Sequence, residues 1–223
     1  MAVKLFFGAI LKFILGVALV GVLIFLPAGT LEFFNGWLLM GVLFVPMFFA
    51  GIVMMFKNPE LLKSRLDAKE KQKDQSIVVN LSGLMFLVGF IVAGFGFRFN
   101  WLILPKSVAI GAAIVFLIAY ILYAEVLREN TYLSRTIKVQ ENQKVIDTGL
   151  YGIVRHPMYS VTLLLFLSMP IVLGSIYSFI IFLAYPFIIA KRIKGEEEFL
   201  EKELEGYREY KQEVKYRLIP FIW

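Results

Sequence analysis

Two short charged clusters hold the side chains of this chain that are best suited to chemistry. Arg155-His156-Pro157 contains the only histidine among 223 residues, and the acidic run Glu196-Glu197-Glu198 follows Arg192 by one helical turn. An imidazole changes its charge near neutral pH, and carboxylates attract cationic groups or accept hydrogen bonds. The aromatic rings of Tyr151 and Tyr159 add faces that attract a cation. The two clusters therefore have the parts of a cation-binding pocket, provided that the fold brings them together.

The segment between the clusters indicates a helical hairpin. Residues 159–190 contain no charged side chain. A single straight helix of this length would be about 48 Å long, whereas the hydrocarbon core of a bilayer is about 30 Å thick. Gly174-Ser175, near the midpoint, offers a turn. We therefore predict two antiparallel arms, residues 159–173 and 176–190, which return both clusters to the same side of a membrane.

The rest of the chain is typical of a membrane protein. Apolar residues make up 59% of it, above the roughly 45–50% of soluble domains. Four apolar runs near the length needed to cross a bilayer precede the clusters, at about residues 5–26, 37–56, 77–97 and 108–124. The predicted fold class is an all-α polytopic membrane protein with four transmembrane helices plus a C-terminal transmembrane helical hairpin, and no Rossmann domain.

This pattern also predicts how the chain is organised. Residues 1–130 are expected to form the N-terminal transmembrane helices, and residues 131–223 the catalytic region with motif loop and hairpin. The highly charged stretch 191–215 is expected to form a separate amphipathic helix on the membrane surface. Val139, Val145 and Ile146 give weak strand signals before a turn at Asp147-Thr148-Gly149.

The charges indicate orientation and exclude several kinds of site. Basic residues gather in loops 57–76 and 125–158 and in the tail after residue 190, so the positive-inside rule predicts cytoplasmic termini and a cytoplasmic active site. Lys12 interrupts the first span and is expected to reach the near interface. The chain has no cysteine, which excludes disulfides, thiolate metal sites and a cysteine nucleophile, and we predict no metal site. The net charge of +6 fits anionic lipid headgroups better than nucleic acid.

Several motifs follow one another in the C-terminal third. They are Gly149-Leu150-Tyr151, Arg155-His156-Pro157 with Tyr159, the apolar hairpin, Arg192 with Glu196-Glu197 and Leu200, Glu209-Tyr210, and Arg217-Leu218-Ile219-Pro220. In this order they resemble the isoprenylcysteine carboxyl methyltransferase family, within a wider group that includes membrane phospholipid N-methyltransferases. The resemblance extends from about Val145 to Trp223, with Val161 where the family usually has glycine.

The resemblance implies S-adenosylmethionine as the methyl donor, bound on the cytoplasmic side by the motif loop, the hairpin and the C-terminal helix. Arg192 and Glu196 are the expected catalytic residues. Because they lie four residues apart on one helix face, we also expect them to pair. The expected cofactor-binding residues are Val145, Gly149, Leu150, Tyr151, Arg155, His156, Pro157, Tyr159, Glu196 and Glu197.

The leading functional prediction is an integral-membrane methyltransferase. Its partners would be a lipophilic or lipidated acceptor, most simply a carboxylate of the isoprenylcysteine type, and membrane lipid, with no nucleic acid; the sequence does not indicate an oligomeric state. Alternatives within the enzyme class are phospholipid or small-thiol methylation. A non-enzymatic membrane protein with a degenerate site is a further alternative, based on Val161. A transporter would need ionisable groups deep in several spans, and only Lys12 qualifies.

Overall fold

The computed structural model describes residues 2–66, 73–134, 136–137 and 139–223, with side chains from residue 5 and, after the first gap, from residue 75. Its described residues are almost all helix or loop, which confirms the predicted all-α class. The N-terminal helices are α1 (Ala2–Ala28), α2 (Phe34–Lys57), α3 (Pro59–Leu66), α4 (Lys73–Arg98) and α5 (Lys106–Glu129). The C-terminal ones are α6 (Pro157–Val172), α7 (Ile176–Phe182), α8 (Tyr185–Glu203) and α9 (Tyr207–Glu213).

Four long apolar helices correspond to the four predicted spans. α1, α2, α4 and α5 are each long and apolar enough to cross a membrane. The short helix α3 lies in the charged stretch after α2, whereas Lys69 and Lys71 of the same basic loop lie outside the described residues. The ammonium group of Lys12 donates a hydrogen bond to the carbonyl of Leu66 at 2.8 Å. Lys12 is thus anchored at the end of α3, where the charge of the ammonium meets the negative end of the helix dipole.

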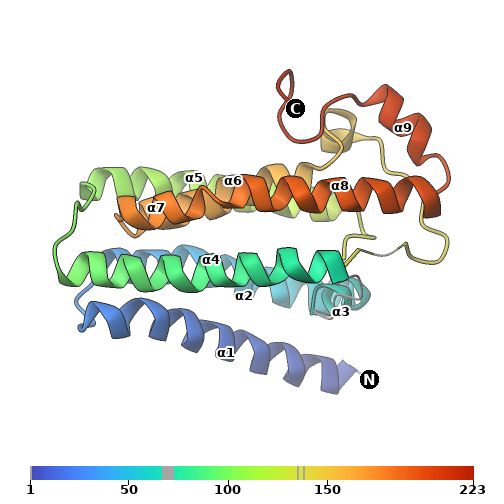
Figure 1. The fold of residues 1–223 in the computed structure, drawn as a ribbon. Helices are drawn as coiled ribbons and strands as arrows, with labels where there is room; N and C mark the ends of the chain where they lie inside the picture. The colour runs from blue at the N-terminus through green and yellow to red at the C-terminus, as the bar shows by residue number, and fades with distance from the viewer. Residues whose placement is uncertain (1, 67–72, 135, 138) are drawn as a thin grey trace.

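The predicted hairpin is confirmed. α6 runs in one direction, and α7 and α8 return antiparallel to it (Figure 1). The turn depends on Gly174, whose φ of +74° is unfavourable for other residues. A side chain there would also come within 2.6 Å of the Asn35 amide nitrogen. Ser175 then caps α7 by accepting a hydrogen bond from the amide of Ser178 at 3.2 Å.

The second arm differs from the prediction. We expected it to end at residue 190 and to be followed by a separate surface helix up to 215, but α8 continues without interruption from the apolar arm to Glu203. Two features explain this continuity: α8 contains no proline after Pro186, and one face of the helix stays buried through Ile189, Ile193 and Glu197. The helix ends only before Gly206, whose φ is +82°, and the chain then turns into α9.

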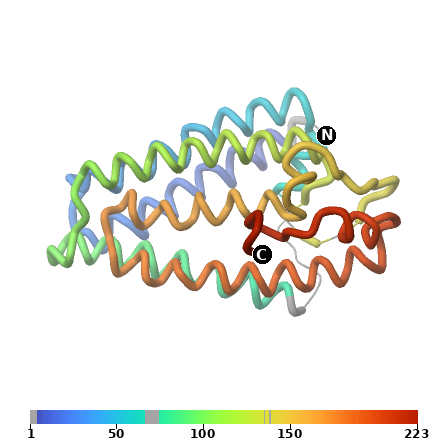
Figure 2. Tube along the Cα trace, turned by 90° about the horizontal axis from the view of Figure 1, so that it is seen from above, coloured from blue at the N-terminus to red at the C-terminus, as the bar shows by residue number. Residues whose placement is uncertain are grey.

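These elements bring the polar segments together at one end of the bundle. The loop after α5, the end of α8 and helix α9 gather there, away from the α1–α2 and α4–α5 connections (Figures 1 and 2). Most of the bundle shares one hydrophobic core, and a smaller cluster of Leu204, Tyr207, Tyr210 and Val214 packs beneath the polar end. The hairpin therefore positions both charged clusters at the same depth.

The hairpin can be tested by labelling single cysteines in this cysteine-free chain. Residue 138, the natural choice in the loop, lies outside the described residues, so we select the exposed positions Glu141, Arg208 and, at the opposite end of the bundle, Glu32 and Lys106. In sealed vesicles, an impermeant maleimide should label Glu141→Cys and Arg208→Cys from one side. Glu32→Cys and Lys106→Cys should be labelled only from the other side. Labelling of residues 141 and 208 from opposite sides would contradict the hairpin.

Candidate active site

The motif loop is held in place by the end of α5. Residues Gly149–Gly152 form a short 3-10 helix, and both carboxylate oxygens of Glu129 accept a hydrogen bond from the amide of Leu150, at 3.0 and 3.2 Å. Gly149 has a φ of +56°, and a side chain there would lie 1.5 Å from a Glu129 oxygen. The glycine is therefore needed for the close approach of this carboxylate, which sets the position of the residues that follow.

The C-terminal tail runs alongside the start of α6. The amide groups of Arg155 and His156 each donate a 2.9 Å hydrogen bond to a tail carbonyl, those of Tyr216 and Arg217. The hydroxyl of Ser160 donates to the carbonyl of Leu218 at 2.6 Å. Pro157 begins the helix, where its missing amide hydrogen costs no bond. Tyr216 and the motif Arg217-Leu218-Ile219-Pro220 that follows it thus position the start of α6, including Arg155 and His156, through the backbone.

Glu197 is the centre of the buried charges. Its side chain is only 3% exposed, and one carboxylate oxygen lies 2.8 Å from Arg155 Nε and 3.3 Å from His156 Nε2. The other oxygen accepts a hydrogen bond from Arg217 Nε at 2.9 Å and lies 3.9 Å from Lys211 Nζ. Because the carboxylate accepts a hydrogen from Nε2, a neutral His156 presents Nδ1 as its acceptor nitrogen. Glu197 therefore sets the orientation and tautomer of the histidine.

Tyr159 connects the two predicted catalytic residues. Its hydroxyl donates a hydrogen bond to Glu196 Oε2 and accepts one from Arg192 Nε at 3.0 Å. Arg192 Nη1 also donates to the side-chain oxygen of Gln75 in α4 at 3.4 Å. The predicted direct pair is wrong: among the described side chains, Arg192 and Glu196 form no ion pair within 4.0 Å, because the tyrosine hydroxyl lies between them.

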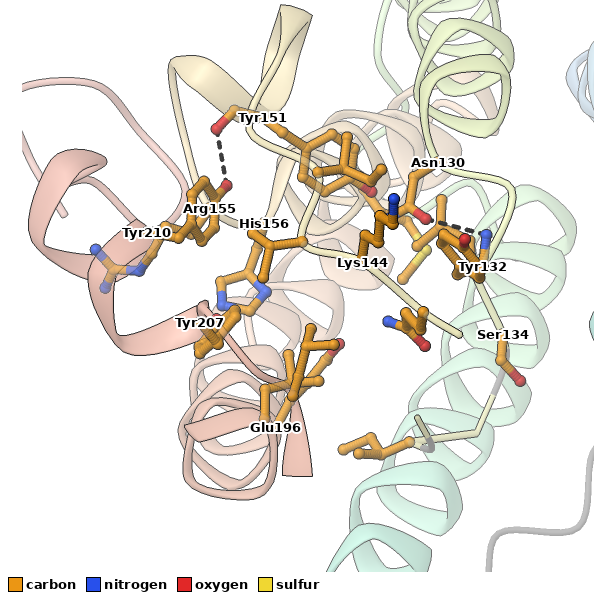
Figure 3. A pocket seen from close by; sticks show the side chains of 18 of the residues that line it. Asn130, Tyr132, Ser134, Lys144, Tyr151, Arg155, His156, Glu196, Tyr207 and Tyr210 are labelled. Atoms are coloured by element: carbon orange, nitrogen blue, oxygen red, sulfur yellow. Dashed lines mark hydrogen bonds between the residues drawn. The ribbon is translucent and has the colours of Figure 1, made fainter. Parts of the chain in front are cut away.

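A cavity opens beside these residues (Figure 3). It encloses about 90 Å³ between the loop after α5, the motif loop, α8 and α9. His156 and Tyr159 form part of its wall, with their rings stacked at 5.7 Å and 28°. Glu196 adds a carboxylate to the lining, and Lys144 adds an ammonium group.

Two hydroxyl groups in the lining make no hydrogen bond to the residues that the structure describes. The hydroxyls of Tyr151 and Tyr207 are buried and make no hydrogen bond within the part of the chain that the structure describes. Tyr210, by contrast, donates to the carbonyl of Tyr151 at 2.7 Å. Burial raises the pKa of all three phenols above the usual range, so they keep their hydrogens at neutral pH. Buried polar groups normally have a hydrogen-bond partner. The hydroxyls of Tyr151 and Tyr207 are therefore available to form hydrogen bonds with a polar ligand in the cavity.

The structure brings six of the predicted site residues to the cavity. They are Val145, Tyr151, Arg155, His156, Tyr159 and Glu196. Five others are not part of the lining but shape the loop, begin α6 or bond to lining residues: Gly149, Leu150, Pro157, Arg192 and Glu197.

Much of the lining consists of residues that the sequence did not predict. The loop after α5 contributes Asn130, Tyr132, Ser134, Thr136 and Gln143, the helices contribute Met158, Leu200, Tyr207 and Tyr210, and Leu204 lies just after α8. The loop residues follow no periodic pattern that would have indicated a site. The two tyrosines of α9, three residues apart in a charged stretch, were a usable signal for one buried helix face. No group of three His, Asp or Glu side chains among the described residues is placed to hold a metal ion.

Comparison with known proteins adds two findings. Residues 106–206, from the start of α5 to the turn before α9, match the model of the phospholipid methyltransferase family. A stretch of 91 residues is 29% identical to the Delta(14)-sterol reductase TM7SF2 of Mus musculus. The aligned stretch covers 40% of this chain and 22% of that protein. The chain thus spans about a fifth of the length of that relative. The family match is to phospholipid methyltransferases and does not single out an isoprenylcysteine acceptor.

The role of Glu197 can be tested by removing its charge. Glu197→Gln leaves Arg155 facing a neutral amide in a buried site, and losing one partner of a buried ion pair costs about 3–5 kcal/mol. Since two tail carbonyls still accept hydrogen bonds from Arg155, we expect the free energy of unfolding to fall by about 3 kcal/mol, the lower end of this range. The destabilisation is measured as a lower midpoint of thermal unfolding in detergent. Glu198→Gln, the same change at an exposed neighbour, is the control, and equal midpoints for the two variants would contradict this role.

Proposed function

We propose that this protein is an integral-membrane methyltransferase that transfers a methyl group from S-adenosylmethionine to a lipophilic acceptor. One observation carries the proposal: the segment that matches the phospholipid methyltransferase family, residues 106–206, includes most of the cavity lining. Within the described residues, α1, α2, α4, α5 and the stretch Ile176–Glu203 of α7 and α8 are long and apolar enough to cross a membrane, and the polar segments gather at one end of the bundle; both findings agree with the proposal. A water-soluble donor and a lipid-soluble acceptor would meet at such a place.

The lining fits the chemistry of the donor. S-adenosylmethionine carries hydroxyl groups, ring nitrogens and a positively charged sulfonium. The lining offers the hydroxyl of Tyr151, the carboxylate of Glu196 and the rings of His156 and Tyr159. Carboxylates and aromatic faces stabilise a positive charge, and the hydroxyl supplies a hydrogen bond. We therefore assign these residues to donor binding, with Val145 as part of the apolar wall.

The size of the cavity adds one requirement. Its volume of about 90 Å³ is below the roughly 300–1,000 Å³ of most small-molecule sites. The side of the cavity formed by residues 130–134 and 143–146 contains no helix or strand. A movement of this side would therefore break fewer backbone hydrogen bonds than a movement of the helices. Donor binding would move this side outward and leave the helix-borne residues in place.

Catalysis would consist mainly of positioning. The bound donor supplies an activated methyl group, so the protein has to orient the two reactants and exclude water. Glu197 holds His156, and Tyr159 links Glu196 to Arg192. We propose that Arg192 orients an anionic acceptor, because its planar guanidinium matches a carboxylate or phosphate group.

The acceptor determines whether a base is needed. A carboxylate of the isoprenylcysteine type reacts as the anion and needs none. An amine, as in a phospholipid headgroup, must lose a proton. His156 lines the cavity, and because its Nε2 is bonded to Glu197, we propose Nδ1 as the nitrogen that would accept this proton. The family match is compatible with either class, and small thiols are a further alternative.

Binding and turnover measurements test the proposal together. Detergent-purified protein should bind S-adenosylhomocysteine, and labelled donor should transfer its methyl group to prenylcysteine analogues, phospholipids or thiols. Binding of reduced nicotinamide dinucleotide without S-adenosylhomocysteine would instead favour a reductase, as in the sterol reductase that the chain resembles over 91 residues. Binding of neither would reject both enzyme classes.

Glu196→Gln tests the assignment of the donor site. The variant keeps the shape of the side chain and a hydrogen-bond acceptor for Tyr159 but removes the negative charge. We expect the dissociation constant of S-adenosylhomocysteine to rise by about tenfold, which is about 1.4 kcal/mol. Calorimetric titration measures it, with Glu198→Gln as the matched control. Unchanged affinity would remove Glu196 from the donor site.

Arg192→Lys separates binding from transfer. Lysine keeps the positive charge but lacks the planar fork that orients a carboxylate. We expect donor affinity to stay within a few-fold, while the rate of methyl transfer falls by about tenfold or more, about 1.4 kcal/mol of barrier. Full activity would remove Arg192 from the catalytic residues. Lost donor binding would move it to the donor site.

A further inference from the structure

Tyr207 is an unexpected residue in the cavity. It lies in α9, outside the motifs that indicated the site, and its side chain points into a region lined by His156 and Glu196 (Figure 3). The residue is only 4% exposed, and its hydroxyl has no hydrogen-bond partner among the described residues. A buried hydroxyl without a partner loses its hydrogen bonds to water and gains nothing in return. Phenylalanine would avoid this cost at the same size.

The neighbouring tyrosine shows the contrast. Tyr210 lies one turn further along α9, with ring centroids 5.8 Å apart. Its hydroxyl donates a 2.7 Å hydrogen bond to the carbonyl of Tyr151 and so ties α9 to the motif loop. The same short helix thus holds one tyrosine whose hydroxyl stabilises the fold and one whose hydroxyl does not.

The surroundings decide what Tyr207 can do. Burial, and then the nearby carboxylates of Glu197 and Glu196, raise its pKa above the usual range, so it remains a phenol that can donate a hydrogen bond. Neither carboxylate accepts a hydrogen bond from Tyr207. They accept from other groups instead: Glu196 from Tyr159, and Glu197 from Arg155 and Arg217. The hydroxyl of Tyr207 therefore has no acceptor in the part of the chain that the structure describes.

We propose that the hydroxyl of Tyr207 donates a hydrogen bond to an oxygen or nitrogen of the bound methyl donor. This inference rests on the proposed function and adds a binding residue that the motifs do not contain. S-adenosylhomocysteine has the same oxygens and nitrogens as the donor and differs only at the sulfur. It therefore reports the contact without turnover.

The test compares Tyr207→Phe with Tyr210→Phe. Both variants lose one phenolic oxygen from α9. The midpoint of thermal unfolding without ligand and the dissociation constant of S-adenosylhomocysteine are measured for each. Tyr207→Phe should unfold at the same or a higher temperature than the wild type and bind about fivefold more weakly, since one net hydrogen bond is lost. Tyr210→Phe should unfold at a lower temperature.

Each other outcome overturns the inference. Unchanged affinity in Tyr207→Phe would mean that the hydroxyl does not touch the donor. A lower unfolding midpoint in that variant would mean that the hydroxyl supports the fold instead. If the wild type binds no S-adenosylhomocysteine, the proposed function fails and the inference falls with it, whereas a failure of the inference alone leaves wild-type binding intact.

Discussion

The buried carboxylate of Glu197 is the constraint on which the rest of the site depends. A charge that is almost completely removed from water must be paired closely, because its desolvation costs several kcal/mol. The partners come from two distant segments, Arg155 and His156 before α6 and Arg217 in the tail. Both segments must therefore reach α8 before the charge can be buried. The same contacts hold His156 in one orientation at the cavity wall.

The hairpin is what makes this pairing possible. Forty-one residues separate His156 from Glu197 along the chain, yet the turn at Gly174 returns α8 to the level of the motif loop. The uninterrupted course of α8 carries the glutamates beyond the apolar arm to the depth of α9 and the tail. A break at residue 190 would have separated the glutamates from the apolar arm. The continuity of the helix therefore matters for the site as well as for the fold.

The adjacent residues Glu196 and Glu197 have different roles because they point in different directions around α8. Successive residues are rotated by about 100° around a helix, so Glu196 and Glu197 face different surroundings. Glu197 is satisfied by buried cations, whereas Glu196 lines the cavity and accepts a hydrogen bond from Tyr159. The tyrosine links Glu196 to Arg192, which is not part of the cavity lining. One carboxylate thus supports the structure, and its neighbour is available to a ligand.

The sequence by itself determined the membrane class, the hairpin and the meeting of the two clusters. These properties depend on the length of the uncharged runs and on the positions of the charges between them. Both can be read directly along the chain without knowing which segments pack together. The predicted residues Tyr151, His156 and Glu196 line the cavity for the same reason, since the hairpin alone brings their segments together.

Only the tertiary structure decided how individual side chains pair. The sequence predicted a direct contact between Arg192 and Glu196 from their spacing, but the hydroxyl of Tyr159, from the other arm of the hairpin, lies between them. Arg217 and Tyr207 come from segments whose approach to the motif loop depends on the end of α8 and the turn at Gly206. A hydrogen bond depends on distances of a few tenths of an ångström. Such distances follow from the packing of whole helices and cannot be read from spacing along one of them.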